Sequence, residues 1–251
     1  MAALQLERRD DGIAVLRLDR PDVRNAMDTA MLAELDAALA GLAADQDLRG
    51  LVFSTTSERA LCAGADVGEE LDAAGGVARM EGFARLYAAV EAFPAPTIAV
   101  CVGNCVGAGA ELAAGCDLRV GGDNLKLLWP GGKLGVPVGP ARLVPLVGLA
   151  KAKELILTGR VVEAAEALEL GLVTRVVAAA EAEAAALELA AALAQQPAAN
   201  LRLLKDLFRE YEGTKYRVLR ENAEIIAFQR EGAGLPYGGV RAGSAGTAPP
   251  S

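Results

Sequence analysis

The stretch 103–117, GNCVGAGAELAAGCD, leads from a buried strand into a helix. The residues before it, TIAVCV at 97–102, are apolar and rich in β-branched side chains, which is typical of a buried strand. Four very small residues at 107–110 then begin a helix, whose first turn carries unpaired N–H groups and a partial positive charge. A ligand oxygen could therefore reach the N–H of Ala108, with the carboxylate of Glu111 directly behind it.

A second loop has the same design. Ala63, Gly64 and Ala65 follow GLVFST at 50–55, another run typical of a buried strand. Two N–H groups from separate loops that point at one oxygen atom form an oxyanion hole. Tight packing of a strand against a helix also requires small residues. An oxyanion hole and simple packing therefore both stay open as interpretations at this point.

The rest of the chain predicts an α/β core followed by an α-helical part. Residues 2–8 and 13–19 alternate apolar and polar positions around Asp11 and Gly12, which predicts a β-hairpin. A helix is predicted to begin near Asp28, and the remaining predicted elements are a helix at 76–93, strands at 118–120, 125–129 and 172–177, and helices at 139–147, 150–158, 163–170, 178–195, 198–211 and 214–230. We expect a core of residues 1–195, a helical region of 196–231 and a mobile tail of 232–251.

Composition and charge argue against several classes of protein. The net charge of −8 argues against a nucleic-acid binder, which normally has a basic face. No stretch approaches the roughly 20 uninterrupted apolar residues of a membrane span, and the start lacks a secretory signal, so a cytoplasmic location is expected. The four cysteines fit no paired zinc spacing and are expected to be reduced thiols in the core. The chain has no histidine, which excludes Ser-His-Asp and Cys-His nucleophile systems.

Four segments resemble, in order and spacing, the crotonase family, the enoyl-CoA hydratase/isomerase superfamily. They read RPDVRNAMDTAM, RALCAGADVGE, GNCVGAGAELAAGCDLRV and ELILTGRVVEAAEALELGLVTRVV. The resemblance implies a spiral of ββα units whose C-terminal helices drive trimerisation, giving a homotrimer or homohexamer. It also implies a lyase or isomerase of fatty acid metabolism that acts on an acyl-CoA thioester. No metal or redox cofactor is implied, because coenzyme A is part of the substrate.

The resemblance implies catalytic roles for three residues. The family stabilises a thioester enolate with two backbone N–H groups, which here would be those of Ala65 and Ala108. Glu111 matches the first of the two catalytic glutamates in the family's hydratases. Fixed donors of this kind meet the negative charge of the enolate oxygen without reorganising.

The resemblance also implies where the substrate binds. The loop 63–68 would line the CoA site, with Asp66 fixing the loop. Arg24 would lie near the CoA nucleotide, or it is an ordinary surface charge. Trp129 would form a wall of the acyl pocket, or it belongs to the core. The predicted substrate-binding residues are Arg24, Ala63, Asp66, Val67, Gly68, Gly107, Trp129 and Gly131.

One position departs from the family's pattern. The second glutamate is expected in a segment F-G-x-P-E, which here reads LLWPGGKLG, so Gly131 follows Pro130 where the glutamate would stand. No Asp or Glu lies between Asp123 and Glu154. Lys133 is the only other titratable side chain in the segment, and it reaches the site or is a solvated loop lysine.

Three interpretations of function stay open. The first is an enzyme of the enoyl-CoA hydratase type with Glu111 as general acid/base, although hydration normally divides its proton transfers between two carboxylates. The second is an isomerase or decarboxylase that needs one carboxylate. The third is an acyl-CoA binding protein without catalysis.

Overall fold

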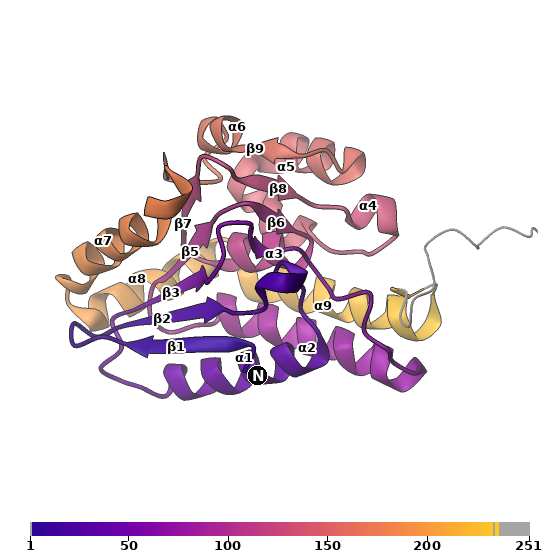
Figure 1. The fold of residues 1–251 in the computed structure, drawn as a ribbon, viewed down its shortest axis with the longest axis horizontal. Coiled ribbons are helices and arrows are strands. Elements are labelled where there is room, and N and C mark those ends of the chain that lie inside the picture. The colour runs from indigo at the N-terminus through magenta and orange to yellow at the C-terminus, as the bar shows by residue number, and fades with distance from the viewer. Residues whose placement is uncertain (1, 233, 236–251) are drawn as a thin grey trace, which may run out of the picture.

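The computed structural model describes residues 2–232 and 234–235, and in this part of the chain the strands form two sheets (Figure 1). The larger sheet has the order β1-β2-β3-β5-β7-β10 and the smaller one β4-β6-β8-β9. The strands are β1 (Leu4–Arg8), β2 (Ile13–Leu18), β3 (Gly50–Thr55), β4 (Ala60–Cys62), β5 (Thr97–Cys101), β6 (Asn104–Val106), β7 (Leu118–Gly122), β8 (Lys126–Leu128), β9 (Val162–Glu163) and β10 (Arg175–Val177). Among the strands of the described residues, only the pairs β1–β2 and β8–β9 are antiparallel.

Helices cover the larger sheet and continue to the end of the described chain. The α-helices are α1 (Thr29–Ala43), α2 (Ala73–Glu91), α3 (Ala108–Gly115), α4 (Gly131–Leu134), α5 (Pro140–Thr158), α6 (Ala164–Glu169), α7 (Ala182–Ala194), α8 (Ala198–Tyr211) and α9 (Thr214–Glu231), with 3₁₀ turns at Pro21–Val23 and Ala179–Glu181. The backbone of Gly148 is not helical, which breaks α5 into two pieces near the predicted gap between 147 and 150. The predicted tail lies outside the described residues from 236 onward.

Side chains along the strands of the larger sheet alternate between its two faces, and each face contributes to a separate hydrophobic core. Ile13, Val15 and Val52 point toward the alanine-rich α7 on one face of the larger sheet. Leu16 and Phe53 point to the other face, where they join the large core that includes α1, α2 and α3. Figure 1 shows α7 on one side of this sheet and α1 and α2 on the other, with α9 lying beside α2. The expected α/β fold is thus confirmed.

The smaller sheet was not predicted from the sequence. Its strands are two or three residues long, so they contain too few positions for a period of two to stand out. The prediction for 125–129 covers β8, whereas β4, β6 and β9 were assigned to loops or to the ends of other elements. This sheet brings the two loops of small residues side by side.

Candidate active site

The pairing of β4 with β6 places the two small-residue loops in contact. The strands run parallel, with Ala60 opposite Asn104 and Cys62 opposite Cys105. A Cβ atom on Gly109 would lie 2.2 Å from the carbonyl oxygen of Cys62, closer than any side chain could tolerate. The small residues are therefore required by packing, and the same packing brings the two backbones together.

Two backbone N–H groups at this junction make no hydrogen bond within the described residues. The N–H of Met27 donates to the carbonyl of Gly64, and the carbonyl of Met27 accepts from the N–H of Asp66, both at 2.8 Å. The N–H of Ala65, which lies between Gly64 and Asp66, takes part in neither bond. Ala108 is the first residue of α3, where a helix has no internal acceptor for the N–H group. Gly107 before it has φ 52°, a left-handed conformation that suits glycine. Both alanines face the same cavity.

This cavity, called here the front cavity, has a volume of about 220 Å³ and mostly apolar walls. The side chain of Tyr87 is the only ionisable one among its described lining residues. Burial raises the pKa of Tyr87 well above its usual value, with a further contribution from the nearby Glu111, so the phenol stays protonated. The apolar walls come from Met80, Phe83, Leu134, Val136, Val138 and Ile225.

Glu111 lies behind the wall of the front cavity. Its side chain is completely buried and is not among the residues that line the cavity. One carboxylate oxygen, Oε2, accepts a hydrogen bond from Nη1 of Arg142 at 3.0 Å, and Oε1 has no partner among the described residues. Burial raises the pKa of Glu111 to about 8, against the lowering effect of Arg142 and with a further rise from Glu221. Burial therefore favours the protonated form of Glu111.

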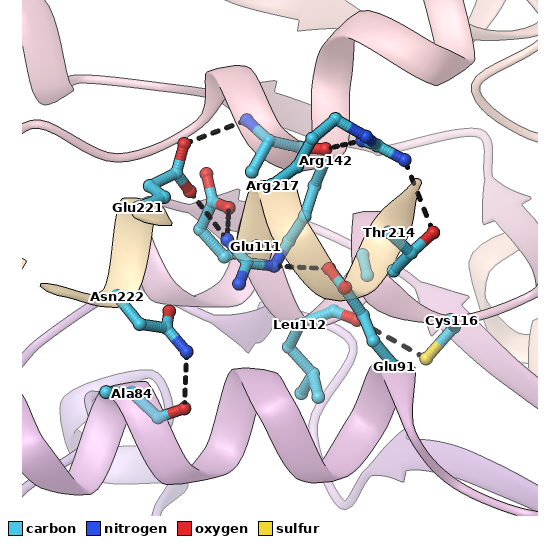
Figure 2. A network of polar contacts seen from close by, with 12 residues as sticks. Ala84, Glu91, Glu111, Leu112, Cys116, Arg142, Thr214, Arg217, Glu221 and Asn222 are labelled. Atoms are coloured by element: carbon cyan, nitrogen blue, oxygen red, sulfur yellow. Dashed lines mark hydrogen bonds and ion pairs between the residues drawn. The ribbon is translucent and has the colours of Figure 1, made fainter. Parts of the chain in front are cut away.

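Arg142 is the centre of a buried charged group, which we call the Arg142 cluster: Arg142, Glu91, Glu111 and Glu221 (Figure 2). Its Nη1 also donates to Oε1 of Glu221 at 2.7 Å, and its Nε lies 2.9 Å from Oε1 of Glu91. The guanidinium carbon sits 4.4 Å from the centre of the Tyr87 ring. Four elements, α2, α3, α5 and α9, thus meet at one guanidinium group.

Glu91 is the second carboxyl group of the cluster that binds protons more tightly than usual. Burial raises the pKa of Glu91 to about 7, and Arg142 only partly opposes this. Together with Arg142, Glu91 borders a second cavity of about 350 Å³, called here the rear cavity, which lies between α3, α5, α8 and α9. No sequence pattern pointed to Arg142, Glu91 or Glu221. The one available signal was a lone arginine within the apolar helix predicted at 139–147.

Gly131 lines the front cavity but leaves no room for a side chain. A Cβ atom there would lie 2.7 Å from the carbonyl oxygen of Val136 and 3.0 Å from that of Val138. The backbone of 136–138 thus fills the space into which a glutamate at this position would begin to extend. Lys133 does not supply the missing group, because its Nζ donates to the carbonyl of Gly159 at 2.8 Å, at the end of α5.

The other predicted site residues are distributed as follows. Ala63, Val67 and Gly107 line the front cavity. Arg24, Asp66 and Gly68 do not line it, and Trp129 is buried in the hydrophobic core instead.

The loop that carries Ala65 is fixed by a short polar network. Asp66 pairs with Arg20 at 3.2 Å, and its side chain also accepts from the N–H of Gly68. The carbonyl of Arg24 accepts from the N–H of Ala63 at 3.0 Å, while the side chain of Arg24 is exposed. Asn25, which the sequence analysis missed, is fully buried and contacts carbonyl groups of β4. Arg24 is therefore a solvent-facing cation directly beside the loop.

Comparison with known proteins assigns the family. The profile described as enoyl-CoA hydratase/isomerase matches residues 8–229. The chain belongs to this family. Its fold matches an enoyl-CoA hydratase of Bacillus anthracis with a TM-score of 0.79 at 26% identity, covering 94% of this chain and 99% of that one. The expected family and fold class are confirmed.

Curated relatives agree with this assignment. A protein of Mycobacterium bovis named as a probable enoyl-CoA hydratase is 37% identical over 204 residues, which is 80% of this chain and 79% of the relative. The mitochondrial enoyl-CoA hydratase domain-containing protein 2 of Mus musculus is 39% identical over 200 residues, which is 74% of this chain and 65% of the relative. The chain is thus an enoyl-CoA hydratase family member.

The described residues contain neither a candidate membrane helix nor a candidate metal site. No helix there is long and apolar enough to span a membrane. The same residues hold no cluster of three or more His, Cys, Asp or Glu side chains that could bind a metal ion. All four cysteines are buried and free, as expected for core thiols.

Proposed function

We propose that the protein polarises an acyl-CoA thioester with the N–H groups of Ala65 and Ala108, and that Glu111 is its single proton-transfer group, in a reaction of the enoyl-CoA hydratase type. The observation that carries this proposal is the pair of unpaired N–H groups at one cavity, with a buried, proton-holding carboxyl group on the same helix. Both donors are held by strand pairing and helix geometry, so they are oriented before the substrate arrives.

The chemistry follows from the charges that develop. Water addition across the α,β double bond, or loss of an α-proton, puts negative charge on the thioester oxygen, which two fixed N–H donors stabilise. Glu111 lies three residues after Ala108, so it comes from the same turn of α3. Its carboxyl group has to turn from Arg142 toward the cavity to reach Cα or Cβ. A pKa of about 8 lets it give a proton near neutral pH and take one back.

The surroundings of the cavity support an apolar acyl group and an anionic carrier. The walls contain aliphatic and aromatic side chains and no charged one among the described residues. The exposed Arg24 next to the loop of Ala63 is placed to meet a phosphate of coenzyme A. Asp66 holds the loop through Arg20 and Gly68, as the proposal requires of a structural residue.

Crotonyl-CoA tests this function directly. The purified protein should remove the enoyl absorbance of crotonyl-CoA, and Glu111→Gln should lower that rate by about 10² to 10⁴ while binding persists, because general acid–base groups contribute on this scale. The exposed Glu188→Gln serves as the matched control and should leave the rate unchanged. Full turnover by Glu111→Gln would exclude Glu111 as the proton-transfer group.

A second candidate is isomerisation of an acyl-CoA double bond, which one carboxylate can carry out. The observation in its favour is Gly131, whose surroundings leave no space for a second carboxylate. A 3-enoyl-CoA should then be converted to the conjugated 2-enoyl-CoA, with a gain of enoyl absorbance, while crotonyl-CoA stays unchanged. Tight binding of both esters without any conversion would instead favour an acyl-CoA binding protein without catalysis. A decarboxylase would release carbon dioxide from a carboxylated acyl-CoA.

We also propose self-association, as a homotrimer or homohexamer. Large apolar side chains are exposed along the last two helices, which supports burial against another copy. They are Leu203, Leu204, Phe208 and Tyr211 on α8, and Tyr216 and Leu219 on α9. Sedimentation of the purified chain measures the mass. The cytoplasmic location stays a prediction, since one relative is mitochondrial by name.

A further inference from the structure

Tyr87 carries the one polar side-chain group that the lining of the front cavity offers to a ligand. Among the described residues of that lining, every other side chain is a hydrocarbon or a thioether, or is absent at a glycine. Tyr87 lines the cavity together with Ala65 and Ala108, whose N–H groups are the proposed donors to the thioester oxygen. Any further oxygen atom of a bound ligand therefore has a single side-chain partner available there, the hydroxyl of Tyr87.

The hydroxyl group of Tyr87 has no partner within the protein. It makes no hydrogen bond with the described residues, although the side chain is only 4% exposed, and buried tyrosine hydroxyls usually have one. The hydroxyl oxygen is also not sealed off, because the fully enclosed polar atoms without a partner belong to other described residues, such as Glu111 and Trp129. The hydroxyl therefore keeps contact with open space, and the space that Tyr87 lines is the front cavity.

Two contacts hold the ring of Tyr87 in place before a ligand arrives. Phe83, one turn earlier on α2, stacks against it with ring centres 6.0 Å apart and an angle of 25° between the planes. The guanidinium carbon of Arg142 lies 4.4 Å from the ring centre. Burial raises the pKa of Tyr87 well above its usual value, so the phenol keeps its proton. It is therefore a fixed hydrogen-bonding group and not a base.

Arg142 brings Tyr87 close to the proposed proton-transfer group. Its Nη1 donates to Oε2 of Glu111 at 3.0 Å, and the same guanidinium group lies over the Tyr87 ring. Helix α2, which carries Tyr87, packs against α3, which begins at Ala108. A thioester oxygen bound at Ala108 thus leaves Cα and Cβ in a cavity of about 220 Å³ that Tyr87 also lines. An oxygen atom bonded to Cβ is the atom of such an ester that suits the hydroxyl of Tyr87.

We propose that the hydroxyl of Tyr87 binds the oxygen that is added at Cβ, and so provides a contact that no carboxylate at Gly131 can make. In hydration, the water oxygen bonds to Cβ, the π electrons move to the thioester oxygen, and one proton of the water passes to the Glu111 carboxylate. Glu111 then returns a proton to Cα. The other hydrogen of the water donates to the phenol oxygen, and the hydroxyl of the resulting 3-hydroxyacyl-CoA keeps this bond. No bond of the phenol breaks.

This role rests on the proposed function, because the thioester has to be held at Ala65 and Ala108. It predicts a preference that binding alone can measure. Butyryl-CoA and 3-hydroxybutyryl-CoA differ only in the hydroxyl at Cβ, and one net hydrogen bond corresponds to about three- to tenfold in Kd. Calorimetric titration of butyryl-CoA and of each hydroxy enantiomer is carried out in the Glu111→Gln background, so that no ester is converted.

With Tyr87 present, the better-bound enantiomer of 3-hydroxybutyryl-CoA should bind about three- to tenfold more tightly than butyryl-CoA. Tyr87→Phe should abolish or reverse this preference, because the Cβ hydroxyl then enters a cavity without a polar side chain. Butyryl-CoA should still bind, which shows that the variant has kept its cavity. The matched control is Tyr211→Phe on α8, whose side chain is 79% exposed and which should keep the preference.

The pattern of the dissociation constants decides between the alternatives. Equal binding of the two esters in the presence of Tyr87, or an unchanged preference in Tyr87→Phe, overturns the role of Tyr87 and leaves the proposed function standing. Weakening of both esters by the same factor also overturns it, because that pattern belongs to a residue that only packs. If neither ester binds, the proposed function fails and the role of Tyr87 fails with it.

A kinetic comparison tests the same role during turnover. With Glu111 intact, hydration of crotonyl-CoA is compared with the uptake of solvent deuterium at Cα of butyryl-CoA in D₂O. Both reactions need the thioester oxygen to be stabilised, but only hydration adds an oxygen at Cβ. The ratio of the hydration rate to the exchange rate should therefore fall about three- to tenfold in Tyr87→Phe and stay constant in Tyr211→Phe. An equal fall of both rates in Tyr87→Phe contradicts the proposal.

Discussion

The front cavity and the Arg142 cluster, which contains Glu111, are built in opposite ways. The front cavity has apolar walls and offers two backbone N–H groups, whose positions depend on strand pairing and on small residues. The Arg142 cluster consists of charged side chains from four elements and depends on long-range contacts. The comparison teaches that the backbone N–H groups of the cavity and the charged partners of Glu111 come from separate parts of this fold. Each part can therefore be changed while the other is monitored.

The strongest test of the front cavity is Gly109→Ala. Its Cβ atom would lie 2.2 Å from the carbonyl oxygen of Cys62, so β4 and α3 have to separate. We expect a loss of more than about 3 kcal/mol in the free energy of unfolding, together with loss of acyl-CoA binding. Chemical denaturation and CoA-ester titration measure the two effects. The control Gly41→Ala, with nothing within 4 Å of its Cβ, should be neutral or slightly stabilising. Equal stability and binding of the two variants would show that close packing of the two loops is not required.

The pH dependence of stability tests the Arg142 cluster. Glu111 and Glu91 have folded-state pKa values of about 8 and about 7, above their ordinary value of 4.5, so the folded chain binds more protons than the unfolded chain in that window. The free energy of unfolding should therefore fall as the pH rises from 4.5 to 8, by roughly 1.4 kcal/mol for each unit of pKa shift.

Thermal unfolding at a series of pH values measures this slope. Glu111→Gln should flatten the slope, since an amide cannot release the proton. Carboxyl groups with lowered pKa values, such as Glu154 and Glu166, act below this window and do not interfere. Stability that rises between pH 5.5 and 8 would contradict the assigned protonation of the cluster.

The variant Gly131→Glu tests whether a glutamate side chain fits at this position of the front cavity. Because the backbone of Val136 and Val138 occupies the space, we expect a loss of about 1–3 kcal/mol in stability and no gain in hydration of crotonyl-CoA. Gly131→Ala should lose a similar amount, which would assign the effect to the Cβ atom rather than to the charge. Increased hydration by Gly131→Glu at unchanged stability would refute the idea that this space is filled.

The smallest expected effect belongs to Arg24, beside the loop that carries Ala63. Arg24→Gln removes an exposed cation and should weaken CoA-ester binding by about two- to fivefold, since exposed charge pairs contribute less than about 1 kcal/mol. Stability should not change. Arg85→Gln, which removes a surface charge paired with Asp36, provides the control and should bind as wild type does. Equal affinity of both variants would place the CoA phosphates elsewhere.

The sequence predicted the two parts of the site unequally. The two small-residue loops of the front cavity could be found because their determinants are local: small residues that follow buried strands. The roles of Ala65 and Ala108 came from the resemblance to the family. The Arg142 cluster was not accessible, because Arg142 and its partners are far apart in the chain, 31 residues for Glu111 and 79 for Glu221. A buried charge network has no periodic pattern that could reveal it. The smaller sheet was missed for a related reason, since three-residue strands such as β4 show no alternation.

The contribution of α9 has a consequence for synthesis on the ribosome. Glu221 caps the N–H of Ala141 and pairs with Arg142, and the adjacent Asn222 donates to the carbonyl of Ala84 in α2 at 2.8 Å. These partners emerge after both sheets have been translated, so the first turn of α5 and the guanidinium group lack them until then. A nascent chain stalled before residue 214 would contain both small-residue loops, but its Arg142 cluster would lack Glu221. Until α9 is complete, Arg142 therefore lacks the carboxyl group of Glu221.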